Sequence, residues 1–390
     1  MKPSHDDWKE CLLGEAVTLK RGYDLTMADR QDGPYPVITS SGFAGFHSEA
    51  KVKGPGVVTG RYGTLGEVHY VETDFWPHNT ALYVRDFKGN HPKFISYFLG
   101  GLHFNTQNAA AAVPGVNRNF LHMIPVRVPS LKVQRQIAGI LSAYDELIEN
   151  SLRRIRLLEE MARALYREWF VHFRFPGHEK YPRVTSPLGD IPKGWEVMPV
   201  ESFCPLVSRG VTPKYEAGSG RFIINQKVNR GSELALDDLK ELEPLLEVPA
   251  DKFARFGDVL VNCLGEGTIG RVHFYAEPHQ EWAVDQHMSI CRATSPTVSL
   301  YVYCALESPE GQGRITSLKT GGTNMTMFNI SALRTFTVVA PPAKLMARFA
   351  ELTLPMLRQK QALTELNRNL RRTRDLLLPR LLSGQVALEA

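Results

Sequence analysis

The chain contains two copies of one sequence pattern, and this duplication constrains the fold more than any single motif does. The stretch Gly63–Val68 recurs as Gly267–Val272, and a tryptophan opens each copy, at Trp8 and Trp195. Further along, one constant offset in residue number pairs Leu121 with Leu333, Val126 with Val338, Pro129 with Pro341, Leu165 with Leu377, Trp169 with Leu381 and Phe170 with Leu382. Each copy ends in a long helical pattern. A duplicated unit of this kind indicates a partner that itself has two parts.

Composition narrows the class of protein. A length of 390 residues suggests two or three domains, and 43% hydrophobic with 22% charged residues is ordinary for a globular protein. No apolar run approaches the roughly 20 residues that a membrane span needs, and the N-terminus lacks the apolar core of a signal peptide. The net charge of +5 permits nucleic-acid binding without establishing it.

Cysteine usage bears on the compartment. The five cysteines are an odd number and include no Cys-x-x-Cys pair. This pattern argues against a disulfide framework and against a cysteine zinc site. We therefore expect a cytoplasmic protein without a metal centre.

Short strands and turns predict a globular domain at residues 1–130 and a second one at 194–341. Strand candidates are Pro34–Thr39 and Gly56–Gly60 in the first copy, and Arg221–Asn225 and Asp258–Asn262 in the second. Long helices are expected at 131–172 and 342–384. The stretch 173–193 is rich in proline and glycine, which is typical of a linker.

The two long helices carry apolar residues at spacings of three and four, which is the pattern of a coiled-coil seam. The predicted seam residues are Ile137, Leu141, Ile148, Leu152, Ile155, Leu158, Leu165, Leu363, Leu366, Leu370, Leu377 and Leu381. Pro355 predicts a kink or a late start in the second helix. The expected fold class is α+β, with two mixed α/β globular domains in pseudo-twofold tandem, separated by two long antiparallel coiled-coil helices.

No motif predicts catalysis. Gly265–Gly270 reads G-x-G-x-x-G, but a dinucleotide site requires a helix there, whereas Arg271–Tyr275 alternates like a strand. We interpret this stretch and its counterpart Gly63–Gly66 as tight turns between strands. Phosphate-binding loops, zinc-protease helices, methyltransferase motifs and a Gly-x-Ser-x-Gly elbow are absent from the sequence. We expect no catalytic residue, metal ligand or cofactor in this chain.

The remaining candidates are loop side chains that can contact DNA. Arginine pairs with guanine, and asparagine or glutamine with adenine, through two hydrogen bonds in the major groove. The candidate base-reading residues are Ser40, Ser41, Arg61, Tyr62, Asn117, Arg118, Asn225, Gln226, Asn229, Arg230, Gln286, His287, Thr323 and Asn324. Candidate phosphate contacts are Lys20, Arg21, Lys51, Lys53, Lys214, Arg221 and Lys227. The alternative for each polar residue is a structural role in a turn.

Several stretches resemble the specificity subunit of type I restriction–modification enzymes, and the resemblance covers essentially the whole chain. Leu188–Glu196 is similar to the start of that family's second target-recognition domain, and Gly56–Gly66 and Gly257–Gly270 to its central strand–turn element. Val128–Leu131, followed by Gln134 and Ile137, resembles the beginning of its long helix, and Leu377–Val386 its closing segment. The second helix departs from the pattern, because Met346 stands where the first has Gln134.

The resemblance implies two target-recognition domains, each of which reads one half of a bipartite, asymmetric sequence in double-stranded DNA. It also implies two methyltransferase subunits, which bind S-adenosylmethionine, and two motor–nuclease subunits, which use ATP and Mg²⁺. A stand-alone DNA methyltransferase or nuclease is the main alternative, and a coiled-coil adaptor without a DNA role is a second. The missing motifs count against the first alternative, and the two diverged, Asn- and Arg-rich domains count against the second.

Overall fold

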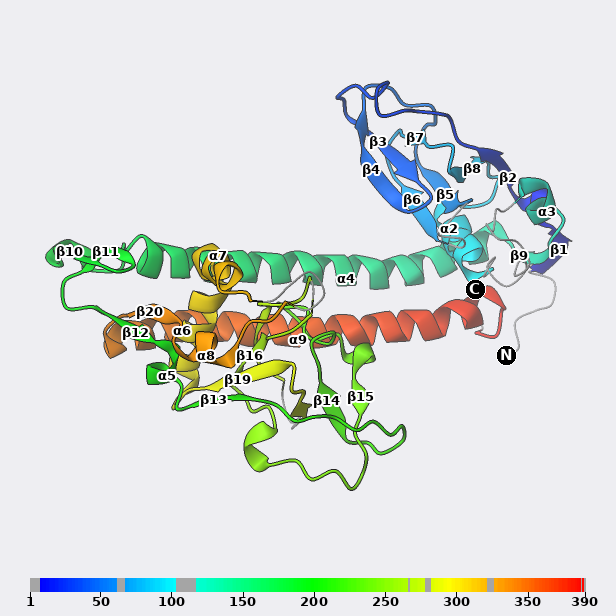
Figure 1. The fold of residues 1–390 in the computed structure, drawn as a ribbon. Coiled ribbons are helices and arrows are strands. Elements are labelled where there is room, and N and C mark those ends of the chain that lie inside the picture. The colour runs from blue at the N-terminus through cyan, green and yellow to red at the C-terminus, as the bar shows by residue number, and fades with distance from the viewer. Residues whose placement is uncertain are drawn as a thin grey trace. The chain divides into compact units, whose positions relative to one another are not determined.

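The computed structural model describes residues 8–61, 67–102, 117–265, 267–277, 282–320, 326–386 and 388 (Figure 1). It consists of two compact units. The first contains residues 1–150 and 366–390, and the second contains residues 151–365. Each unit therefore holds one globular domain together with a part of each long helix.

The described globular part of the first unit is built from three sheets and three short helices. The first sheet is an antiparallel pair, β1 (Trp8–Leu12) with β9 (Pro125–Pro129). The second is antiparallel, in the order β2 (Thr18–Arg21)–β8 (Ala81–Asp86)–β5 (Gly56–Gly60)–β6 (Val68–Val71). The third has the order β4 (Gly42–His47)–β3 (Tyr35–Thr39)–β7 (Trp76–Pro77). In the last sheet β7 is parallel to β3. The helices are α1 (Leu13–Ala16), α2 (Pro92–Gly101) and α3 (Arg118–His122).

The second unit repeats this plan. The first sheet here pairs β12 (Glu196–Pro199) with β20 (Thr337–Ala340). The second has the order β13 (Leu206–Arg209)–β19 (Met288–Arg292)–β16 (Val259–Asn262)–β17 (Val272–Phe274). The third has the order β15 (Lys240–Glu241)–β14 (Phe222–Ile224)–β18 (Ala283–Val284), with β18 parallel to β14. Its helices are α5 (Val200–Phe203), α6 (Pro296–Glu307), α7 (Pro309–Ser317) and α8 (Ile330–Arg334), with single 3₁₀ turns η4 (His178–Lys180), η5 (Leu236–Asp238) and η6 (Ala250–Lys252).

The order of strands is the same in both units, so the duplication seen in the sequence is a duplication of fold. The constant offset in residue number holds for the elements that follow the sheets. Helix α3 begins at Arg118 and α8 at Ile330, while α4 (Leu131–Tyr166) and α9 (Ala343–Leu382) begin at equally shifted positions. Helix α4 continues as a π-helical segment, η3 (Arg167–Val171). The predicted fold class is confirmed.

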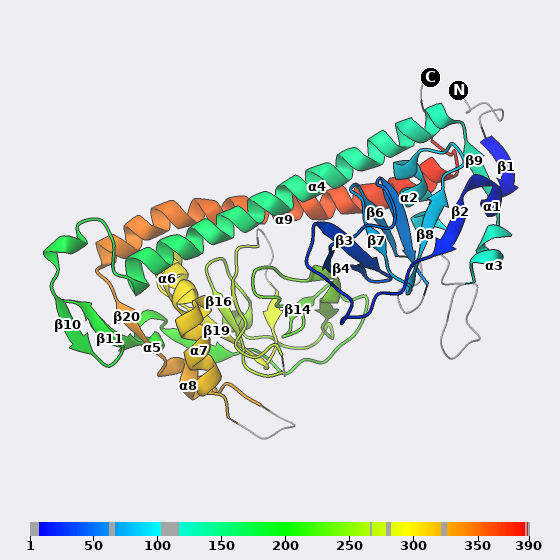
Figure 2. The same cartoon turned by 90° about the horizontal axis from the view of Figure 1, so that it is seen from above.

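The two long helices run antiparallel within each unit (Figure 1 and Figure 2). In the first unit, Ile137 and Leu141 near the start of α4 share a core with Leu381 near the end of α9. In the second unit, Tyr166 near the end of α4 and Phe349 near the start of α9 share a core, with ring centroids 6.2 Å apart. The apolar stripes are thus covered by one another and by the adjoining globular domain.

One predicted seam residue is wrong. Leu366 is 46% exposed, and the buried position on that turn belongs to Asn367. Beyond Leu363, the residues of α9 that face inward are Asn367, Leu370 and Arg374. The inward position on this turn is therefore one residue later than the predicted Leu366, and it is occupied by a polar side chain. Of the other predicted seam residues, Ile137, Leu141, Ile148, Leu363 and Leu381 are buried, and Leu152, Ile155, Leu158, Leu165, Leu370 and Leu377 are half-buried.

Three local expectations are resolved by the fold. A late start of the second helix is wrong, because α9 begins at Ala343 and continues through Pro355. The proline-rich stretch 173–193 is more ordered than a linker, since it forms the hairpin β10 (Arg183–Ser186)–β11 (Gly189–Pro192). The turn interpretation of the second glycine-rich stretch is confirmed for its described residues, which connect the antiparallel strands β16 and β17. Its counterpart Gly63–Gly66 lies outside the described residues.

Candidate nucleic-acid interface

Each unit has a glycine at which two chain segments touch through their backbones. At Gly22, which follows β2, an added Cβ would lie 2.2 Å from the carbonyl oxygen of His78. At Gly210, which follows β13, it would lie 1.8 Å from the carbonyl oxygen of Val284. Only glycine permits this approach. The segment after β2 is therefore held against the turn before β8, and the segment after β13 against the turn before β19. We call this pair of backbone contacts, at Gly22 and at Gly210, the glycine frame.

In the first unit this frame gathers the ends of several strands. Ser40 and Ser41 lie in the turn between β3 and β4, and the Ser40 amide donates to Thr80 Oγ1 at 3.3 Å. The Arg61 amide, just after β5, donates to the Thr80 carbonyl at 3.2 Å. The His69 ring on β6 lies 3.5 Å from the Ser40 carbonyl. Two of the predicted base-reading positions, Ser40 and Arg61, thus meet at Thr80.

In the second unit the end of β16 joins two predicted loops. The Asn262 side chain donates to the Gln226 carbonyl at 3.0 Å, and the Cys263 amide donates to the His287 carbonyl at 2.9 Å. Gln226 and Gln286 both keep partly exposed side chains. The loop after β14 and the turn before β19 therefore both bond to the end of β16, and each carries a partly exposed glutamine.

His287 is held by a buried carboxylate. Its Nδ1 lies 2.9 Å from Oδ1 of Asp285, and its amide donates to the same oxygen at 2.8 Å. Burial raises the pKa of the Asp285 carboxyl, although hydrogen bonds and charge from His287 act in the opposite direction. The contact orients a partly exposed ring that has a second nitrogen available for a ligand.

Two predicted base-reading asparagines support this surface from within instead. Asn229 is 0% exposed and Asn225 is also buried, so the prediction that they contact bases is contradicted. The Asn229 amide group donates to Asn262 Oδ1 at 2.9 Å, and its oxygen accepts from the Gly231 amide at 2.8 Å. Asn225 Oδ1 accepts from the Lys227 amide at 2.8 Å. These bonds shape the loop that displays its neighbours.

Asn117 is a helix cap. Its Oδ1 accepts from the Asn119 amide at 3.0 Å, at the start of α3. Asn329, its counterpart in the second copy, caps α8 in the same way through the Ser331 amide at 3.1 Å. The repeated cap explains the asparagine without DNA. Asn117 and Arg118 are both exposed.

Arg221 is a structural arginine and not a surface cation. Its guanidinium donates to the backbone carbonyls of Glu243 at 3.0 Å, Pro244 at 2.6 Å and Leu246 at 3.0 Å. A guanidinium with its donors used in this way has little left for a phosphate. The prediction of a phosphate contact at Arg221 is therefore contradicted.

The other cations are available at the surface. Arg21 pairs with Asp24 at 3.1 Å and Lys51 with Glu49 at 3.1 Å, both across largely exposed pairs that are worth little in water. A phosphate can replace such carboxylates at small cost. Lys53, Lys214, Lys227 and Arg230 are also exposed, and Lys20 is half-buried beside Tyr23. Tyr62, Thr323 and Asn324 lie outside the described residues.

Comparison with known proteins agrees with this architecture. The family described as "Type I restriction modification DNA specificity domain" matches residues 5–160. The MjaIX specificity subunit of a type I restriction enzyme from Methanocaldococcus jannaschii is 25% identical over 301 residues, which cover 72% of this chain and 65% of that protein. The MjaVIII specificity subunit from the same organism is 28% identical over 115 residues, covering 30% of this chain and 26% of that protein.

A solved structure extends the likeness of fold to the whole chain. The S subunit of a type I restriction–modification system from M. genitalium matches with a TM-score of 0.67 at 13% identity, over 98% of this chain and 99% of that one. By sequence, this chain is therefore similar to type I specificity subunits, and residues 5–160 match the DNA specificity domain of that family. The two sequence matches span less than two thirds of those relatives' own length.

Sequence reasoning missed the glycine frame of this chain. The available signal is an Arg-Gly dipeptide at the end of the first strand of each four-stranded sheet, at 21–22 and at 209–210. It also missed Asn79 and Thr212, whose side chains bond across the frame. Asn79 donates to Asp24, and Thr212 donates to Gln286 at 2.7 Å.

Within the described residues, no cluster of His, Cys, Asp and Glu side chains is suited to hold a metal ion. Among the same residues, no helix combines the length and the apolar character needed to cross a membrane.

Proposed function

We propose that this chain is a specificity subunit, which selects the DNA sequence for a type I restriction–modification complex by reading a bipartite, asymmetric target. The observation that carries the proposal is a difference between the two units at equivalent places. The parallel pair β3–β7 of the first unit corresponds to β14–β18 of the second, with Ile38 opposite Pro77 and Ile224 opposite Val284. Two residues further along each strand, Ser40 corresponds to Gln226 and Asn79 to Gln286. One backbone frame therefore displays different side chains in its two copies.

Different side chains read different bases. Glutamine and asparagine form two hydrogen bonds with adenine, whereas serine is short and donates or accepts at any base edge. The second unit, with Gln226 and Gln286 at matching positions two residues beyond the paired Ile224 and Val284, is suited to adenine-containing steps. The first unit, with Ser40 beside Arg61, is suited to a half-site that contains guanine. Because the copies differ, the two half-sites differ, and the target has no dyad symmetry.

Affinity without sequence information is assigned to the surface cations. Lys51 and Lys53 of the first unit, and Lys214 and Lys227 of the second, contact phosphates and fix the register of each domain on the duplex. Binding should weaken as salt rises, because each neutralised phosphate releases counterions.

The spacing between half-sites follows from the duplex. Two domains that read the major groove from one side meet it about one helical turn apart, or ~10 bp from centre to centre. If each domain reads ~3–5 bp, the unread gap is roughly 5–8 bp. The antiparallel stretches of α4 and α9 set this spacing and dock two methyltransferase subunits, which bind S-adenosylmethionine. Two motor–nuclease subunits, which use ATP and Mg²⁺, complete the complex.

The chain itself is assigned no catalytic step. The rival proposal, a stand-alone methyltransferase or nuclease, predicts that the purified chain binds S-adenosylmethionine or cuts DNA. Isothermal titration of the isolated chain with S-adenosylmethionine separates the two. A saturable heat of binding would refute the non-catalytic assignment.

A domain exchange tests the bipartite target. The chain is co-expressed with its methyltransferase subunit in cells that lack other adenine methylation, and the methylome is sequenced. Replacing residues 1–128 by the matching domain of a relative should rewrite one half-site and leave the other half-site and the gap unchanged. A palindromic, continuous target, or a change in both halves, would refute the proposal.

A further inference from the structure

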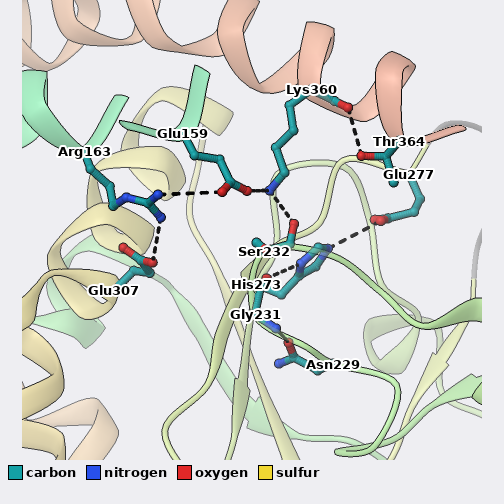
Figure 3. A network of polar contacts seen from close by, with 10 residues as sticks. All are labelled: Glu159, Arg163, Asn229, Gly231, Ser232, His273, Glu277, Glu307, Lys360 and Thr364. Atoms are coloured by element: carbon teal, nitrogen blue, oxygen red, sulfur yellow. Dashed lines mark hydrogen bonds and ion pairs between the residues drawn. The ribbon is translucent and has the colours of Figure 1, made fainter. Parts of the chain in front are cut away.

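The loop that carries Gln226 in the second unit is tied to the scaffold at its far tip. Two successive backbone carbonyls there receive side-chain donors (Figure 3). The Gly231 carbonyl accepts from His273 Nδ1 on β17 at 2.8 Å, and the Ser232 carbonyl accepts from Lys360 Nζ on α9. A loop tip held by two donors from two different elements has little freedom to move as a rigid body.

Hydrogen bonds within the loop carry this constraint to the reading side chains. The Gly231 amide donates to Asn229 Oδ1 at 2.8 Å, the Asn229 amide to the Asn225 carbonyl at 3.3 Å, and the Lys227 amide to Asn225 Oδ1 at 2.8 Å. The path from the tethered tip to the exposed Lys227 is thus an unbroken series of bonds. Displacing the tip displaces the side chains that the loop presents.

Lys360 is a largely buried lysine on the long helix α9. Its side chain is 11% exposed, and its ammonium lies 2.8 Å from Oε1 of Glu159 on α4. Glu159 in turn lies 3.7 Å from Arg163, which reaches Glu307 on α6 at 3.7 Å (Figure 3). Burying an ammonium is costly unless it is paired and its hydrogen bonds are satisfied. Glu159 and the Ser232 carbonyl are both partners of this buried ammonium.

In the first unit an apolar residue takes the place of this lysine. The offset between the two copies puts Ile148 of α4 where the second unit has Lys360, and Ile148 is buried. The reading turn of the first unit is also shorter and closes on itself, since Thr39 Oγ1 donates to the Gly42 carbonyl at 3.0 Å. A tight turn needs no outside anchor, whereas the longer loop of the second unit does.

We propose that Lys360 is a positioning residue for DNA specificity, which holds the reading loop of the second unit in register and so sharpens discrimination in the second half-site only. The inference rests on the proposed function. Lys360 does not touch DNA in this proposal; it acts through the Ser232 carbonyl and the loop behind it.

The test compares two variants that differ only in the tether. Glu159→Gln keeps the Lys360 donor on the Ser232 carbonyl and removes one charge. The double variant Glu159→Gln, Lys360→Met removes the donor as well and leaves no buried carboxylate unpaired, so that it retains its fold. Arg348→Met, at an exposed arginine of α9, is the surface control.

Each variant is assembled with its methyltransferase subunit, and kcat/KM for methylation is measured on duplexes with single substitutions in either half-site. We expect the double variant to lose about tenfold or more of its discrimination in the second half-site and to keep wild-type discrimination in the first. Glu159→Gln and Arg348→Met should keep both.

Equal loss in the two half-sites, or wild-type discrimination by the double variant, would overturn the role of Lys360 while leaving the proposed function intact. A wild-type complex that methylates no bipartite target would overturn both. Melting temperatures and co-purification of the variants, measured in parallel, separate a loss of register from a loss of fold.

Discussion

Replacing Gly210 by alanine should break the frame that supports the second reading surface. The added Cβ would lie 1.8 Å from the Val284 carbonyl oxygen and 2.6 Å from that of Asp285. Both obstacles are backbone atoms, so no side chain can rotate out of the way. An ordinary contact requires more than about 3 Å, and the chain after β13 must therefore move by more than about 1 Å.

That movement removes two backbone hydrogen bonds. The Val211 amide donates to the Val284 carbonyl at 2.8 Å, and the Gln286 amide donates to the Val211 carbonyl at 2.8 Å. Their loss costs about 1 kcal/mol each, and residual overpacking costs about 1–3 kcal/mol. The expected loss is about 3–5 kcal/mol of the free energy of unfolding, or on the order of 10 °C in melting temperature for a unit of this size.

Gly313→Ala is the matched control in the same unit. Gly313 lies inside α7, and no heavy atom lies within 4 Å of the Cβ that alanine would add. Alanine there should stabilise the helix by about 0.8–1 kcal/mol. Thermal unfolding followed by circular dichroism measures both variants. A melting temperature for Gly210→Ala within about 2 °C of wild type would refute the reasoning on the frame, because the backbone would have absorbed the clash without cost.

Two further predictions test other parts of the structure. Leu363→Asp should destabilise the helix pair by about 3 kcal/mol or more, because Leu363 is only 6% exposed. Leu366→Asp should cost less than about 0.5 kcal/mol, because Leu366 is exposed. Chemical denaturation measures both free energies of unfolding, and equal losses would show that Leu366 does belong to the seam. Burial lowers the pKa of His122, whose Nε2 accepts from the Leu19 amide at 2.9 Å and must be unprotonated to do so. Since the folded pKa lies below the unfolded value of about 6.5, this stabilisation is complete above that pH and is lost as the pH falls. His122→Gln should therefore flatten the decline in melting temperature between about pH 7.5 and 5.5, and an unchanged decline would contradict the role of the imidazole.

Regular periodicity made the long helices predictable. Apolar residues at spacings of three and four define a stripe from local sequence alone, and the starts of α4 and α9 follow from the prolines before them. The error at Leu366 has a physical cause. A pattern of hydrophobic residues cannot show that Asn367 takes the inward position, because leucine at the adjacent place fits the same period.

Loop residues were harder to assign, because exposure in a loop depends on distant backbone. Asn225 and Gln226 are adjacent and chemically alike, yet one is buried and the other displayed. Arg221 appeared to be a surface cation until the fold brought three carbonyls from beyond Glu241 to its guanidinium. Composition contains no information about such pairings.

The sequence by itself determined the duplication, the two long helices, the tight turn at Gly267–Gly270 and the resemblance to type I specificity subunits, since all of these depend on the order and spacing of residues along the chain. The tertiary structure decided which polar side chains support the loops and which face outward. It also revealed the glycine frame at Gly22 and Gly210 and the tether at Lys360. The reason is physical: burial and hydrogen bonding are settled between segments far apart in sequence, where one backbone carbonyl can turn a candidate DNA contact into a structural residue.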